Sequence, residues 1–112
     1  MNIKGKMLNL LMIGIDYGMV TEEQCSEIRP AIRNWSVIQC EKMEGMFTEL
    51  LNFMKANPPN LENMRYVMKM IIDSTMKTGA TKGFAIAIIG HQMLVNKDNI
   101  PGLWSAVLSK HG

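Results

Sequence analysis

Apolar residues recur at helical spacing along most of the chain, and short polar or proline-containing stretches separate these repeats. The clearest repeat covers residues 31–56, where one side of a helical wheel is apolar and the other is polar. Its apolar positions are Ile32, Trp35, Met43, Met46, Phe47, Leu50, Phe53 and Met54. This pattern predicts a long amphipathic helix with one buried face. Gly45 lies on the polar side of that helix, so packing against the core does not explain it.

Turn and capping residues divide the first third of the chain into helices. Gly18 ends an apolar first segment in the manner of a helix-terminating glycine. Thr21 and Gln24 have the spacing of a capping box, which predicts the start of a second helix. Pro30 then predicts that this helix covers only 22–29 and that a separate, longer helix begins with the proline in its first turn. A single kinked helix is the alternative.

Proline and asparagine residues mark the helix ends in the second half of the chain. Pro58 disfavours a helical conformation at Asn57, and Asn60 then caps a new helix that ends near Gly79. The predicted inner face of this helix is Leu61, Met64, Val67, Met68, Ile71 and Ile72. Residues 99–101 open a last short helix. Its predicted inner face is Leu103, Trp104, Val107 and Leu108.

The segment 80–97 is apolar on every side, unlike the other predicted helices. Its two apolar sides are Phe84, Ile88, His91 and Val95, and Ile86, Ile89 and Met93. Residues 84–89 also match a buried strand, but the length of the segment and the lack of a second strand candidate favour a helix. Such a helix either lies at the centre of the fold or packs on its own core and on a second chain.

These elements together predict an all-α fold, a compact bundle of five to six short-to-medium helices in a single helical domain, 1–112. The chain has 112 residues, of which 47% are hydrophobic, and this is enough to build a core without disulfides or a metal ion. Twelve methionines are an unusual number for this length. Most of them fall on the predicted inner faces, where filling the core explains them.

Composition and motifs exclude several functional classes. The net charge of +2 is too small, and its basic residues too scattered, for a nucleic-acid footprint. Cys25 and Cys40 show no metal or redox spacing and are far in sequence from His91 and His111, so we expect no metal and no cofactor. Two free thiols are typical of a reducing compartment, which predicts a cytoplasmic protein. No catalytic motif is present, which indicates that the protein is not an enzyme.

Neither apolar run of the chain has the features of a membrane or export segment. The run over residues 83–95 is too short to cross a bilayer. The run over residues 7–15 follows two lysines, as in a secretion signal, but a cleavage site of small residues does not follow it. We therefore expect a first amphipathic helix and no membrane partner.

Two apolar residues fall on an otherwise polar helix face. Tyr66 and Met70 are one turn apart and lie opposite the predicted inner face of their helix, near Glu62 and Asn63. Methionine adapts to varied partners and tyrosine is enriched at interfaces, although single exposed apolar residues are also common on surfaces. This pair is therefore a candidate contact site.

The sequence thus favours a non-catalytic protein–protein interaction module, such as a small accessory, inhibitor or assembly protein. We expect it to bind an unidentified protein partner and to self-associate as a dimer. The predicted partner interface is Tyr66, Met70, Ile86, Ile89 and Met93. One alternative is a small nucleic-acid-binding regulator that uses Arg65, Lys69, Lys77 and Lys82. A second alternative is a ligand-binding or enzymatic domain with a site near His91.

Overall fold

A computed structural model describes residues 2–76 and 84–112, with only the helical backbone described at 75, 76 and 84–89. The described residues form helices and no strand, which confirms the all-α expectation and makes residues 84–89 helical. The elements are α1 (Ile3–Asp16), α2 (Glu22–Arg33), α3 (Val37–Ala56), α4 (Leu61–Met76), α5 (Phe84–Val95), the 3₁₀ turn η1 (Lys97–Asn99) and α6 (Ile100–His111).

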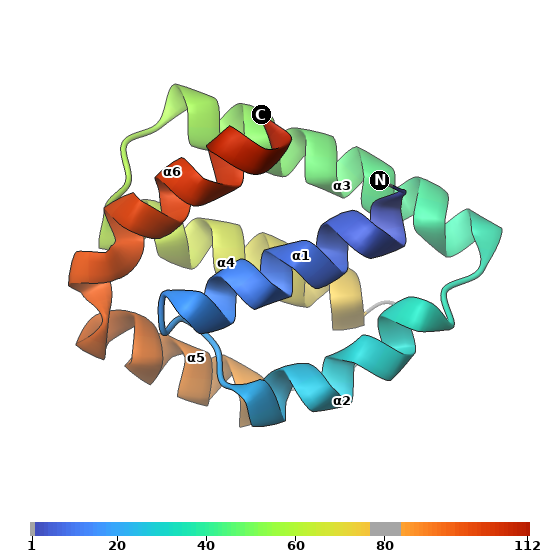
Figure 1. Cartoon of the computed structure of the whole chain (residues 1–112), viewed down its shortest axis with the longest axis horizontal. Helices are drawn as coiled ribbons and strands as arrows, with labels where there is room; N and C mark the ends of the chain where they lie inside the picture. The colour runs from blue at the N-terminus through green and yellow to red at the C-terminus, as the bar shows by residue number, and fades with distance from the viewer. Residues whose placement is uncertain (1, 77–83) are drawn as a thin grey trace.

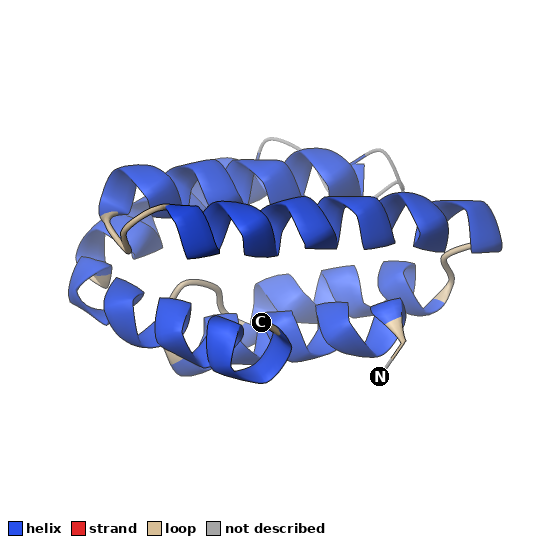
Figure 2. Cartoon of the chain, turned by 90° about the horizontal axis from the view of Figure 1, so that it is seen from above, coloured by secondary structure: helices blue, strands red, loops and turns tan. Residues whose placement is uncertain are grey.

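The helices are arranged in two layers. Figure 1 shows α4 between α3 and α5, with α1 in front of it, and Figure 2 shows α3 and α4 in one layer and α1 and α6 in the other. The molecule measures 36 × 29 × 19 Å, and its short dimension matches two helices of about 10 Å diameter each. The inner sides of both layers enclose the core.

The connection between α1 and α2 forms as its sequence predicts. Gly18 has a φ of +75°, and its N–H and that of Met19 donate to carbonyls of the last turn of α1, at Ile15 (3.0 Å) and Gly14 (2.8 Å). Thr21 and Gln24 then form both hydrogen bonds of a capping box. These local bonds set the sharp turn that lays α2 against α1.

The boundary between α2 and α3 differs from the expectation. α2 continues through Pro30, so the helix is not limited to 22–29, and it ends before α3, so a single kinked helix does not form either. A second capping box decides the boundary, since Ser36 Oγ accepts from Gln39 N at 3.2 Å and Gln39 Oε1 accepts from Ser36 N at 2.8 Å. Pro30 removes one backbone hydrogen-bond donor from an exposed side of α2. The capping box, in contrast, satisfies two backbone donors at the start of α3.

The connection between α3 and α4 confirms the proline and asparagine signals. Asn57 is extended, with φ of −132° and ψ of +147°, as its position before a proline requires. Asn60 Oδ1 accepts from Asn63 N at 2.9 Å and so caps α4. The expected helix end at Gly79 lies outside the described residues.

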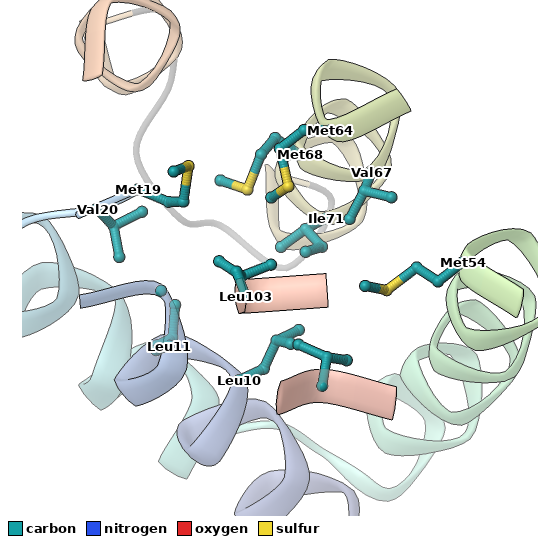
Figure 3. A pocket seen from close by; sticks show the side chains of 12 residues that line it. Leu10, Leu11, Met19, Val20, Met54, Met64, Val67, Met68, Ile71 and Leu103 are labelled. Carbon is teal, nitrogen blue, oxygen red and sulfur yellow. The ribbon is translucent and has the colours of Figure 1, made fainter. Parts of the chain in front are cut away.

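Methionine side chains line a small central cavity of about 40 Å³. Figure 3 shows them converging from α3, from α4 and from the α1–α2 connection, together with leucines of α1 and α6. The four methionines are Met19, Met54, Met64 and Met68. All four are at most 8% exposed, so these residues fill the core, as the positions of Met54, Met64 and Met68 on apolar helix faces predict.

The carboxyl-terminal end of α6 is held against α1 and α3 by His111. Its Nε2 lies 2.8 Å from Oδ1 of Asn9, and its ring packs edge-on against Phe47 with the centroids 5.3 Å apart. Burial, followed by the nearby positive charges of Lys110 and Lys6, lowers the pKa of His111 from its usual value of 6.5. The folded protein therefore favours the neutral imidazole.

Acidification from about pH 7.5 to about pH 5.5 is expected to lower the free energy of unfolding through His111. Because its pKa is lower in the folded than in the unfolded state, the unfolded chain binds more protons in this range. The contribution of neutral His111 is complete above pH 6.5 and is lost as the pH falls towards the folded-state pKa. Urea denaturation across this range measures the slope. The variant His111→Gln is expected to flatten it, and an unchanged slope in that variant contradicts the prediction.

Candidate protein-interaction surface

The outer side of α4 lies at the middle of one broad face of the molecule, between α3 and α5 (Figure 1). On this side of the helix, residues three and four positions apart neighbour each other. We define the α4 face as Arg65, Tyr66, Lys69, Met70 and Asp73. The first three side chains, in chain order, are exposed, and the last two are half-buried.

Tyr66 is the main aromatic feature of the α4 face. Its side chain is 52% exposed, although its ring is large and apolar. The ring stacks on Phe53 of α3, with centroids 4.3 Å apart and planes inclined by 26°. Phe53 in turn packs against the core. The stack holds Tyr66 in one orientation, which reduces the side-chain entropy that a partner must restrict on binding.

A first hollow opens beside Tyr66, between α3 and α4. It has a volume of about 310 Å³. Its lining residues are Glu49, Tyr66, Lys69, Met70, Asp73 and Ser74. The apolar parts of Tyr66 and Met70 therefore lie next to positively and negatively charged side chains. Protein contact sites often have this composition, with an apolar centre and a polar rim.

A second hollow lies on the other side of α4, towards α5, and has a volume of about 300 Å³. Met68, Ile72 and Met93 supply its apolar lining, and Lys69 and Asp73 line both hollows. Gly90 also lines it, and a Cβ built at this glycine meets no atom within 4 Å. The missing side chain on α5 therefore leaves this hollow open.

The structure brings together two of the five predicted interface residues and buries a third. Tyr66 and Met70 line the same hollow, as expected from their spacing. Met93, predicted at the partner interface, is only 4% exposed and belongs to the core, although it also lines the second hollow. Because α5 is apolar on every side, the wheel did not show which side packs on α4. The side chains of Ile86 and Ile89 lie outside the described residues.

Sequence reasoning missed other parts of the surface. Phe53 was assigned to a core face, and only the packing of α3 on α4 shows that it supports Tyr66. The glycine in the middle of an apolar helix, Gly90, was the available signal for the second hollow. At the start of α3, Val37 and Ile38 are also exposed, and Val37 lines a separate hollow of about 360 Å³ between α1 and α3.

Among the residues that the structure describes, those required by the two alternative functions do not form a site. His91, expected inside or at an interface, is exposed and does not line either hollow beside α4. Arg65 and Lys69 are exposed on α4, but Asp73 lies in the same row, and Lys77 and Lys82 are outside the described residues.

In the described part of the chain, neither a reactive cysteine nor a group of metal-binding side chains forms a further site. Cys25 is buried, and desolvation raises the pKa of its thiol, which disfavours the reactive thiolate. In the part of the chain that the structure describes, no three His, Cys, Asp or Glu side chains are grouped so that they could hold a metal ion.

None of the described helices has the length and apolar character needed to cross a membrane.

Comparison with known proteins gives no relative of this chain. No protein-family model, no curated protein and no solved structure matches it. Function is therefore inferred from the α4 face and its two hollows alone.

Proposed function

We propose that this protein acts without catalysis, by binding another protein through the α4 face. The observation that carries this proposal is Tyr66, whose half-exposed ring is held by Phe53 at the edge of a hollow that Met70 also lines. A pre-positioned aromatic side chain beside an apolar hollow with charged residues around it resembles the anchors that dominate protein interfaces. None of the residues that line the two hollows is a histidine or a cysteine.

The same proposal places the protein in the cytoplasm and includes self-association. Both cysteines are free thiols in the structure, which supports a reducing compartment. A broad face of 36 by 29 Å offers enough area for the roughly 800 Å² per partner that a standard interface buries.

Site-specific photo-cross-linking in the native host tests this proposal. A photoreactive phenylalanine analogue in place of Tyr66 is expected to form a covalent adduct with a protein, which mass spectrometry then identifies. The matched control carries the same analogue at Met12, an apolar residue of α1 that is 57% exposed. Adducts that are equally weak at both positions, or stronger at Met12, overturn the proposal.

A further inference from the structure

Three charged residues form a row along the α4 face. Arg65, Lys69 and Asp73 follow one another at intervals of four positions, so they lie on one side of the helix. Within the part of the chain that the structure describes, none of the three side chains forms an ion pair or a hydrogen bond. The row is therefore available to charges from outside the molecule.

When the row is reversed, the charge at each end is opposite to the charge at the same end of the original row. Arg65 and Asp73 lie on opposite sides of Lys69, each about 6 Å from it along the helix axis. If a second α4 is laid antiparallel, with a two-fold axis at Lys69, each Arg65 faces the Asp73 of the other copy. The two ends of the row thus form two oppositely charged pairs at once.

The apolar residues of the α4 face fit the same arrangement. A two-fold axis of this kind brings the same side of both helices together, so the side that carries Tyr66 meets its own copy. Tyr66 and Met70 are one turn apart, and reversal places each Tyr66 against the Met70 of the other copy. The hollow between α3 and α4 of one copy then opens towards the same hollow of the other copy, and both are covered.

We propose that the partner of the α4 face is a second copy of this chain, held by antiparallel contact of the two α4 helices about an axis at Lys69. This inference rests on the proposed function and names the partner of the same surface. The two copies of Lys69 meet at the axis, where their long, flexible side chains diverge into solvent. Because the charged pairs lie near the surface, dimerisation is expected to weaken as salt concentration rises.

Charge exchange tests the arrangement on purified full-length protein by sedimentation velocity. R65D and D73R each replace two attractive pairs by two repulsive ones, so each variant alone is expected to raise the dimer dissociation constant about tenfold or more. The double variant R65D/D73R restores opposite charges in both pairs. It is expected to dimerise within about threefold of the natural protein. An equimolar mixture of the two single variants is expected to form heterodimers. Circular dichroism of each variant verifies that it is folded.

Two results overturn this inference. The first is that the natural protein remains monomeric up to about millimolar concentration. The second is that the double variant and the mixture dimerise no better than the single variants, which places the contact elsewhere. Both results leave the proposed function testable, because cross-linking at Tyr66 to a different protein supports that function without a dimer.

Discussion

Replacing Trp104 with alanine is expected to lower the free energy of unfolding by about 3–5 kcal/mol. Trp104 is 4% exposed, and its indole Nε1–H donates a buried hydrogen bond of 2.9 Å to the backbone carbonyl of Met54. In a regular helix this carbonyl accepts from the residue four positions later, which here is Pro58 and carries no N–H. Trp104 therefore fills the core and also supplies the donor that the proline lacks.

The variant Trp104→Phe separates these two contributions. It retains most of the apolar volume but leaves the carbonyl of Met54 without its donor, so we expect an intermediate loss of about 1–3 kcal/mol. Urea denaturation followed by circular dichroism measures both variants. A loss below about 1 kcal/mol for Trp104→Ala contradicts the packing that the structure assigns to α6.

Replacing Gly18 with alanine is expected to lower the free energy of unfolding by about 2–3 kcal/mol. The φ of +75° at Gly18 is a left-handed conformation that residues with a Cβ adopt only at a cost. A Cβ there also lies 3.0 Å from Cγ of Asn96. The Asn96 amide donates to the Gly18 carbonyl at 3.0 Å, so its displacement weakens the contact between the end of α1 and the end of α5.

Gly45→Ala is the matched control for this substitution. Gly45 lies inside α3, is exposed, and has no atom within 4 Å of a Cβ built on it. Alanine is expected to raise the free energy of unfolding by about 0.5–1 kcal/mol, because glycine loses more backbone entropy in a helix. Chemical denaturation compares the two variants directly. Equal effects of the two substitutions contradict the role assigned to the backbone of Gly18.

Local signals in the sequence predicted most of the helix ends correctly. The capping box at Thr21, the glycine at position 18 and the cap at Asn60 each depend on bonds within a few positions of the chain, so their outcome needs no distant contact. The prediction at Pro30 was wrong because α2 continues through the proline to Arg33. The competing capping box at Ser36 was not recognised.

The candidate site was predictable only in part. The helical wheel showed that Tyr66 and Met70 share an outward face, because the other side of α4 has enough apolar residues to form a core face. The wheel could not show that Met93 belongs to the core, since an all-apolar helix has no polar side to orient it. It also could not show that Phe53 stacks on Tyr66, because that contact depends on how α3 and α4 pack.

The sequence by itself determined that this protein is helical and where most of its helices begin and end, because capping bonds and apolar spacing act over a few residues. The tertiary structure alone decided which apolar residues are exposed, because burial depends on contacts between distant segments. The bond between Trp104 and Met54 joins residues 50 positions apart, and the hollows of the α4 face lie between helices. The surface on which the proposed function depends therefore appears only when the helices are packed.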